Sequence, residues 1–202
     1  MVFRLFSLPL DILKFMRRLF FALIIPVAFL IGCSNKEYVP KFEDFQGLVI
    51  TEVAANADKT DVHSWVEIMN TSGRDIKLRG VGLYLSAGSL SGEKISAADG
   101  VTLKAGHRLV LSTEDNTLTR GISSESDFYL VLGMAADKDV VDSFDRDGLG
   151  LAGPTARYGS YQEMPEGSGK WEMTAQATRR IRNYDAKPNG VWLWSTHMFK
   201  WM

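Results

Sequence analysis

Two glutamates in the N-terminal half of the chain are the residues whose type and spacing could do chemistry. Glu52 lies in the segment VITEV and Glu67 lies in the segment WVEIM. Two carboxyl groups about 5 to 9.5 Å apart can hydrolyse a glycosidic bond, one as an acid and the other as a base or nucleophile. A buried carboxylate with no such task must be protonated or hydrogen-bonded. The interpretation that we adopt is structural: each glutamate should accept hydrogen bonds from backbone N–H groups of a loop.

A second place for chemistry is the acidic segment 135–148. Asp145 and Asp147 are one residue apart before Gly148, a spacing that a hard cation such as Ca²⁺ favours, but the rest of an EF-hand loop is missing. We therefore expect a hairpin turn with exposed aspartates, with a Ca²⁺ site as the alternative. The sequence has no metal-binding histidine spacing, nucleophile elbow, phosphate-binding loop or dinucleotide fingerprint. We expect no other cofactor and no catalytic residue.

Both glutamates lie in short segments whose apolar residues recur with a period of two, as in β-strands. The first segment predicts two opposite rows: Leu48, Ile50 and Glu52 on one face, and Val49 and Val53 on the other. Segment 65–69 has the same period, and segment 81–85 is the third strand expected. Turn residues separate these segments at short spacing, which favours an antiparallel β-sandwich.

The order of these segments resembles the lamin tail domain family, an immunoglobulin-like β-sandwich found in nuclear lamins and in many secreted or surface-attached bacterial proteins. The matching positions are Ile50, Glu52, Val53, Trp65, Glu67, Asn70, Leu78 and Gly80, whereas Thr51 stands where the family has Asn. Segments 101–111, 128–132, 140–143 and 158–171 follow in family order, so the resemblance covers residues 47–183. It implies that Glu52, Trp65, Glu67, Asn70 and Gly80 are structural motif residues. We expect Trp65 and Trp171 to be core residues, because large aromatic side chains dominate sandwich cores.

The N-terminal 33 residues have the pattern of an export signal. Arg17 and Arg18 precede an uncharged apolar run of 13 residues, Leu19 to Ile31, which is too short to span a bilayer comfortably. The ending LIGC resembles the bacterial lipobox, which implies lipidation of Cys33 and attachment to membrane lipid. Met16 would be a better start than Met1, so residues 1–15 are interpreted as a mis-called extension.

Composition and charge narrow the class of partner. The chain of 202 residues is 46% hydrophobic and 23% charged, as in an ordinary globular domain. Without residues 1–33, 19 basic and 23 acidic residues remain, a net charge of −4. Arg179, Arg180 and Arg182 are expected at a solvated strand end, and we expect no nucleic-acid partner.

The segments on either side of the predicted domain differ in character. Residues 34–46 are polar and predict a tether, and Ser34 after the cysteine points to the outer membrane by resemblance to lipoprotein sorting signals. Residues 184–202 form an aromatic extension with Trp192, Trp194 and Trp201. We expect an added strand that completes or covers a sheet edge. The alternative is an exposed aromatic face that binds a glycan or a protein.

The sequence thus predicts a lipid-anchored, non-enzymatic binding or tethering module, displayed from the outer membrane on its periplasmic or surface face. The partner is an unknown protein or glycan. The alternative is a glycan-binding accessory protein or a glycoside hydrolase that uses Glu52 and Glu67. An exposed cleft with both carboxylates would favour the alternative, and carboxylates packed under loops would favour the module.

Overall fold

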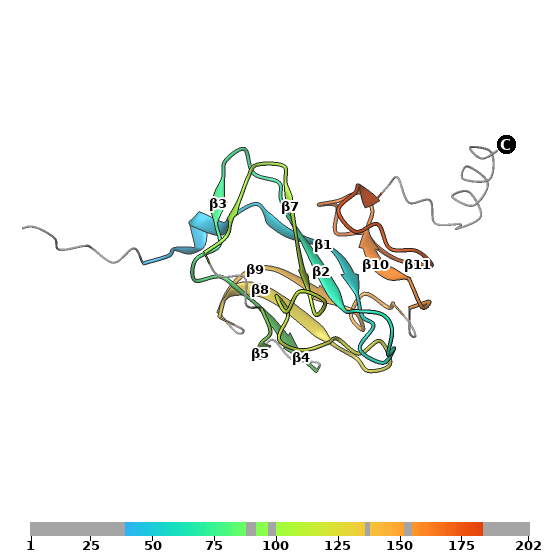
Figure 1. The fold of residues 1–202 in the computed structure, drawn as a ribbon. Coiled ribbons are helices and arrows are strands. Elements are labelled where there is room, and N and C mark those ends of the chain that lie inside the picture. Colours follow the sequence, from blue (N-terminus) through green and yellow to red (C-terminus); the bar gives the residue numbers. More distant parts are fainter. Residues whose placement is uncertain (1–38, 88–91, 97–99, 136–137, 152–154, 184–202) are drawn as a thin grey trace, which may run out of the picture. The chain divides into compact units, whose positions relative to one another are not determined.

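The computed structural model describes residues 39–87, 92–96, 100–135, 138–151 and 155–183 (Figure 1). Nearly all of these belong to one compact unit that begins at Pro40. The described residues form eleven strands, all in antiparallel pairs, and one short 3-10 helix, η1 (Phe42–Phe45). The prediction of an all-β antiparallel fold is confirmed.

Two sheets and a separate strand pair make up the unit. The first sheet has the order β11 (Trp171–Thr174), β10 (Ser160–Glu163), β1 (Leu48–Ala54), β2 (Trp65–Asn70) and β7 (Arg108–Ser112). The second has the order β5 (Glu93–Lys94), β4 (Gly82–Ser86), β8 (Tyr129–Ala135) and β9 (Lys138–Asp145). The pair consists of β3 (Ile76–Lys77) and β6 (Thr102–Leu103).

The hydrophobic core lies between the two sheets, as in a sandwich. Val66 and Ile68 of the first sheet belong to the same buried cluster as Leu83, Leu130 and Phe144 of the second. Burial of such side chains stabilises the fold by about 1.5 to 3 kcal/mol each. The inner face of β2 therefore has the apolar row that its sequence predicts.

In β1 the predicted alternation is broken by a β-bulge at Thr51. Ile50 pairs with Ile68 and Glu52 pairs with Glu67, so that one strand has an extra residue. The extra residue returns Val53 to the core face, where it is fully buried with Ile50. The sequence prediction placed Glu52 on the same face as Ile50 and Val53 on the other face. From Thr51 onward this assignment of faces is wrong.

The bulge has a polar partner on the second sheet. The Ile50 N–H donates a 2.6 Å hydrogen bond to Asp142 Oδ2 of β9. β10 pairs with Glu52 and Val53 of β1, beyond this point. The carboxylate thus supplies a hydrogen-bond acceptor where the strand ladder has none to offer. Burial raises the pKa of Asp142, and the Ile50 N–H partly offsets this effect.

The folded unit begins earlier than the sequence predicts. Phe45 of η1 is fully buried in the core, and the Lys41 N–H donates to Asp44 Oδ2 at 2.9 Å. The boundary expected between the tether 34–46 and the domain 47–183 therefore moves to Pro40. Phe45 in the core, Pro40 beside Gly80 and the Glu43 carbonyl bonded to Arg74 attach this segment to the folded unit.

Several predictions fall on residues that the structure does not describe. The signal segment, Cys33 and the aromatic extension with Trp192, Trp194 and Trp201 lie outside the described residues. Across the part of the chain that is described, no helix has the length and apolar character needed to cross a membrane.

Candidate functional site

Glu52 and Glu67 come together on the outer face of the first sheet, the face turned away from the main core. They are direct partners in the ladder between β1 and β2, so their side chains are neighbours. Neither glutamate is exposed to solvent. The two carboxylates of the sequence prediction are thus a real pair, and the Thr51 bulge sets their register.

Glu52 is surrounded by donors from β10 and from the chain after β11. Its Oε1 accepts hydrogen bonds from Ser160 Oγ at 2.5 Å, Gln162 Nε2 at 3.0 Å and the Thr178 N–H at 2.8 Å. Its Oε2 accepts one from Thr178 Oγ1 at 2.8 Å. Four donor groups therefore converge on one buried carboxylate.

Glu67 has a smaller set of partners that includes a cation. Its Oε2 accepts a 2.7 Å hydrogen bond from the Arg180 N–H, and its Oε1 accepts one from Thr51 Oγ1 at 3.0 Å. Arg108 Nε on β7 lies 3.2 Å from the same Oε1. The expectation that each glutamate accepts a backbone N–H from a loop is confirmed.

Residues 175–183, here called the covering loop, provide these N–H groups. The loop is held at its end by Asn183, whose Nδ2 donates to the carbonyl oxygens of Thr51 at 2.6 Å and Glu163 at 3.1 Å. Near its middle, Arg179 packs over the Trp65 ring at 5.9 Å and pairs with Glu114 at 2.7 Å. The loop is therefore fixed at both places where it crosses the carboxylates.

The arginines of this loop correct one prediction. Arg179, Arg180 and Arg182 lie after β11 in the covering loop, not in a strand end. The backbone leaves the ladder at Thr174 because the following residues turn over the sheet to reach Glu52 and Glu67. Arg180 of this triplet contributes its main-chain N–H to Glu67, and the N–H that binds Glu52 belongs to Thr178.

The β10–β11 hairpin adds a second group of charges beside the loop. Glu166 of this hairpin pairs with Arg108 of β7, and its Oε1 accepts a 3.0 Å hydrogen bond from the Asn183 N–H. Glu163 accepts the Gly167 and Gly169 N–H groups, each at 2.6 Å. These contacts join β7, the hairpin and the end of the covering loop.

Burial dominates the protonation of this layer. It raises the pKa of Glu67 to about 7, although the Arg180 N–H and the Thr51 hydroxyl act in the opposite direction. It also raises the pKa of Glu52, against the hydrogen bonds from Ser160 and Thr178. The charged forms are disfavoured because low-dielectric surroundings replace water.

The geometry decides what the pair can do chemically. A hydrolase needs a sugar and a water molecule in contact with its two carboxyl groups, whereas Glu52 and Glu67 have no exposed surface. Their oxygens are occupied by donors from the bulge, from β10 and from the covering loop. In this arrangement they hold the covering loop on the sheet.

The remaining motif residues also have identifiable contacts. Asn70 Nδ2 donates to the carbonyl oxygens of Arg74 at 2.8 Å and Leu103 at 2.9 Å, so it ties β2 to the β3–β6 pair. Gly80 has a φ of +83°, and a Cβ there would meet Pro40 Cγ at 2.6 Å. Only glycine combines that backbone conformation with so close an approach.

The predicted tryptophans differ in exposure. Trp65 is buried in a small outer cluster with Ala54 and Val110. Trp171 is half-buried, and its ring lies 4.5 Å from that of Phe144 in an edge-to-face arrangement. Both pack within the fold, as expected of core residues.

The acidic turn that was a candidate for Ca²⁺ is bonded internally. The Gly148 N–H donates to Asp145 Oδ1 at 2.9 Å, and the Gly150 N–H donates to the Asp147 carbonyl at 2.8 Å. Among the residues that the structure describes, no group of three or more histidine, cysteine, aspartate or glutamate side chains could hold a metal ion.

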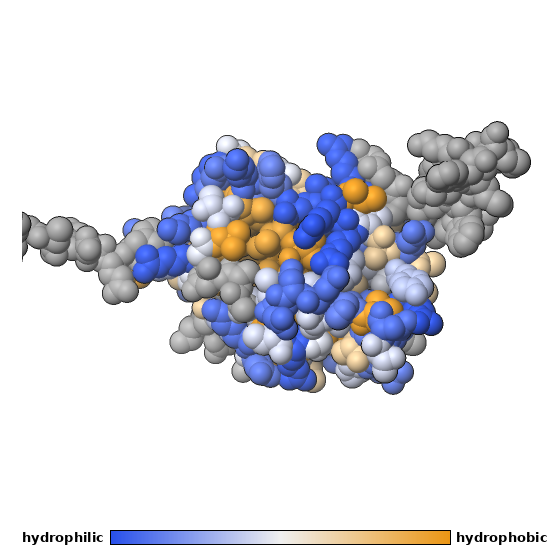
Figure 2. Space-filling view, in the orientation of Figure 1, coloured by the Kyte–Doolittle hydropathy of each residue, from blue (hydrophilic) through white to orange (hydrophobic). Residues whose placement is uncertain are grey.

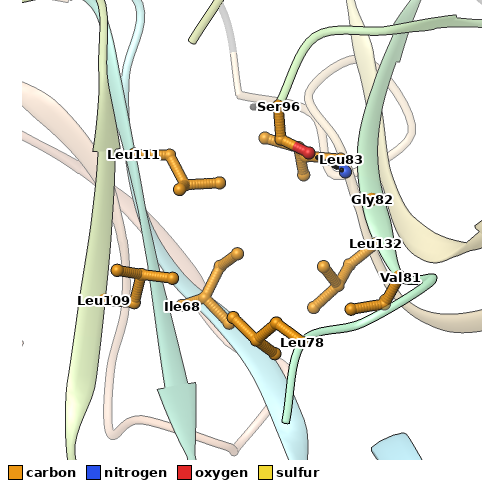
Figure 3. A pocket seen from close by; sticks show the side chains of 9 residues that line it. All are labelled: Ile68, Leu78, Val81, Gly82, Leu83, Ser96, Leu109, Leu111 and Leu132. Atoms are coloured by element: carbon orange, nitrogen blue, oxygen red, sulfur yellow. Dashed lines mark hydrogen bonds between the residues drawn. The ribbon is translucent and has the colours of Figure 1, made fainter. Parts of the chain in front are cut away.

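An apolar hollow opens between the sheets at a different place. Figure 2 shows a central apolar patch with hydrophilic residues around it. The room inside the hollow is about 10 Å³, enough for about one water molecule. Side chains from both sheets point into it (Figure 3): Ile68, Leu109 and Leu111 from the first, and Leu83 and Leu132 from the second. We call this place the seam hollow.

Sequence reasoning missed the donors on β10. Ser160 and Gln162 are two residues apart in the segment SYQE, which is the period of one strand face. Gln162 lies directly opposite Glu52 in the ladder. The polar residues Ser160 and Gln162 on one face of a strand were the signal that the sequence offered. The sequence did not show that this strand would pair with β1.

No protein-family model and no curated protein matches this chain. Its functional assignment therefore depends on the geometry described above and on the sequence patterns.

Proposed function

We propose that this protein is a lipid-anchored, non-enzymatic binding or tethering module of the lamin-tail type, displayed from a bacterial outer membrane. The observation that carries the non-enzymatic part is the burial of Glu52 and Glu67. Both carboxylates have zero exposure and are saturated by donors from their own chain. The pair of carboxyl groups that the sequence suggested for hydrolysis is thus used to close the fold.

The anchor is supported by the sequence at residues 17–33. Two arginines, an apolar run of 13 residues and Cys33 follow one another in the order of a lipoprotein signal. Each buried CH₂ of an acyl chain contributes about 0.8 kcal/mol to membrane binding. One acyl chain binds reversibly, and stable attachment takes a second acyl chain or another membrane-binding signal. A cysteine with several acyl chains meets that requirement alone.

The lamin-tail type is supported by where the resembling residues lie. Glu52 and Glu67 belong to adjacent strands and share the covering loop. Asn70 and Gly80 stabilise the turns that follow β2 and β3. Residues that match the family pattern thus hold connections of the fold, which agrees with a structural motif.

The anchor is tested by metabolic labelling with a palmitate analogue. The wild-type chain should incorporate the label and remain with the membrane fraction, and Cys33→Ser should do neither. The single cysteine of the chain makes this control unambiguous. Label that survives the substitution would overturn the anchor.

The non-enzymatic assignment is tested with the same membranes. Incubation with a panel of β- and α-linked glycans should release no sugar above the level of a strain that lacks the protein. Release of sugar that disappears in Glu67→Gln, while the protein stays folded, would replace the proposal by the hydrolase alternative. Glycan binding without hydrolysis would identify the module as the sugar-binding accessory form.

A further inference from the structure

The covering loop meets Glu52 through a hydroxyl group that has more neighbouring acceptors than hydrogens. Thr178 Oγ1 lies 2.8 Å from Glu52 Oε2 and 3.1 Å from Asn183 Oδ1. A hydroxyl group has a single hydrogen to donate, but it can also accept a hydrogen bond. If Glu52 is ionised, both of these oxygens require the same hydrogen, and one of the two contacts is left without a proton between its atoms.

The orientation of the Asn183 carboxamide decides where that hydrogen goes. Its Nδ2 donates to the carbonyl oxygens of Thr51 and Glu163, which can only accept. Oδ1 therefore faces Thr178 as an acceptor. Asn183 is fully buried, and a buried acceptor without a donor destabilises the fold. The hydrogen of the Thr178 hydroxyl is thus required by Asn183.

The other oxygen of Glu52 is already occupied by N–H groups. Oε1 accepts the Thr178 N–H and Gln162 Nε2, and the same Nε2 donates to the Gln176 carbonyl, which fixes the orientation of that amide. These N–H groups can only donate, so a proton on Glu52 belongs on Oε2. From Oε2 it points at Thr178 Oγ1. Each hydrogen in the series from Glu52 through Thr178 to Asn183 then has one acceptor.

The charges around Glu52 favour the same assignment. Glu67 of β2 is its ladder partner, and Arg108 of β7 lies against Glu67. Neighbouring carboxyl groups do not both ionise at low cost, so an ionised Glu67 beside Arg108 favours a proton on Glu52. Burial also raises the pKa of Glu52. The other charged side chains of β10, β11, their hairpin and the covering loop are exposed or bound to other groups: Glu163, Glu166, Lys170, Glu172, Arg179, Arg180 and Arg182.

We propose that Glu52 is a neutral carboxylic acid in the folded protein, and that its proton on Oε2 closes a relay through Thr178 to Asn183 that latches the covering loop. When Glu52 ionises, its O–H bond breaks and the proton passes to a hydroxide ion, which becomes water. The Thr178 hydroxyl then turns to Glu52 Oε2, and Asn183 Oδ1 loses its donor. The latch is therefore closed in acid and neutral surroundings and is released as the pH rises through the ionisation of Glu52.

Carbon-13 NMR of the full chain in detergent micelles, with label in the side-chain carboxyl carbons of glutamate, tests the protonation state. The Glu52 resonance is assigned through the backbone and by its absence in Glu52→Gln. At neutral pH it should have the position of a protonated carboxyl group. Glu172, which is exposed on β11, is the matched control and should have the position of an ionised group. A Glu52 resonance at the ionised position would overturn the proposal.

Trypsin cleavage after Arg180, followed by mass spectrometry, tests the latch. The Arg180 residue is exposed, but cleavage requires the covering loop to open. A peptide with the sequence of residues 175–183 corrects for the effect of pH on the protease. Relative to this peptide, the wild-type rate should increase by at least about tenfold as the pH rises through the ionisation of Glu52. Glu52→Gln should show no such increase, because a carboxamide has no acidic proton to lose.

Three outcomes would overturn the latch. The first is an equal increase of cleavage in the wild type and in Glu52→Gln. The second is a wild-type loop that resists trypsin after the Glu52 resonance has moved to the ionised position. The third is a Glu52 that keeps its proton until the whole protein unfolds, because the loop would then not be released by itself. The last two need only the wild-type chain, so they decide the matter even if Glu52→Gln does not fold.

Discussion

The outer face of β2 and the seam hollow contain opposite chemistry, but most of the side chains at both places are closed to solvent. On the outer face, the covering loop shuts the carboxyl groups of Glu67 and its neighbour Glu52 off from water. At the seam, most of the aliphatic side chains that line the hollow belong to the buried core, and Leu109 is half-buried. The comparison teaches that the fold uses its conspicuous carboxyl groups in the same way as its apolar side chains, to close a layer against water.

The largest effect on stability is expected from a substitution of Glu52. Glu52→Ala leaves donors from Ser160, Gln162 and Thr178 buried without an acceptor. We expect a loss of about 3 to 5 kcal/mol in the free energy of unfolding, measured with urea. The exposed Glu172→Ala on β11 is the control and should change stability by less than about 0.5 kcal/mol. Equal effects of the two substitutions would show that Glu52 is not sealed.

The protonation of the sealed face predicts how stability depends on pH. Burial raises the pKa of Glu67 from 4.5 to about 7 in the folded protein, so the folded state binds this proton more tightly than the unfolded state. The resulting stabilisation is present below pH 4.5 and is lost as the pH rises through about 7, to a total of about 3 kcal/mol. Unfolding measured from pH 5 to pH 8 should show this decline, and Glu67→Gln should make it smaller. A wild-type stability that rises across this range would contradict the sign.

A smaller loss is expected from Glu67→Gln itself. At pH 5 the protonated carboxyl has one hydrogen, whereas the carboxamide has two, and one of these must face Arg108 Nε or the Arg180 N–H. We expect a cost of about 1 to 3 kcal/mol, seen as a lower melting temperature. Unchanged stability together with a lost hydrolytic activity would favour the enzyme alternative.

The smallest effect is expected at the seam. Leu109 is half-buried, so Leu109→Ala removes less buried surface than a substitution in the main core. We expect a cost of about 1 kcal/mol in urea unfolding. Glu52→Ala should therefore cost more stability than Leu109→Ala. The reverse order would contradict the assignment of the covered carboxyl groups as a central part of the fold.

Local pattern was sufficient to predict much of this fold. The period of two in residues 48–53 and 65–69 located β1 and β2, although a bulge breaks it at Thr51. The need of a buried carboxylate for donors predicted the loop N–H groups. What local pattern lacked was pairing over long distances. The Thr51 bulge, the Asp142 contact to Ile50 and the row of Ser160 and Gln162 depend on which strands become neighbours, and no spacing within a strand encodes that.

Phe45 shows the same limit at a domain boundary. The segment 34–46 has the composition of a tether, and composition averages over residues. Phe45 is nevertheless buried in the core, and the folded unit begins at Pro40. Likewise, the arginine-rich sequence did not indicate that the N–H groups of Thr178 and Arg180 would bind Glu52 and Glu67.

Amide hydrogen exchange at Thr178 and Arg180 tests the central claim most directly, because these N–H groups bind Glu52 and Glu67. If the covering loop is a fixed part of the fold, both amides should exchange as slowly as the amide of Ile68 in the core strand β2. Exchange would then require global unfolding of the protein. Exchange of Thr178 and Arg180 many times faster than Ile68, in a protein that remains folded, would show that the loop opens as a lid. The two carboxylates would then be accessible to a substrate, and the proposal of a non-enzymatic module would be wrong.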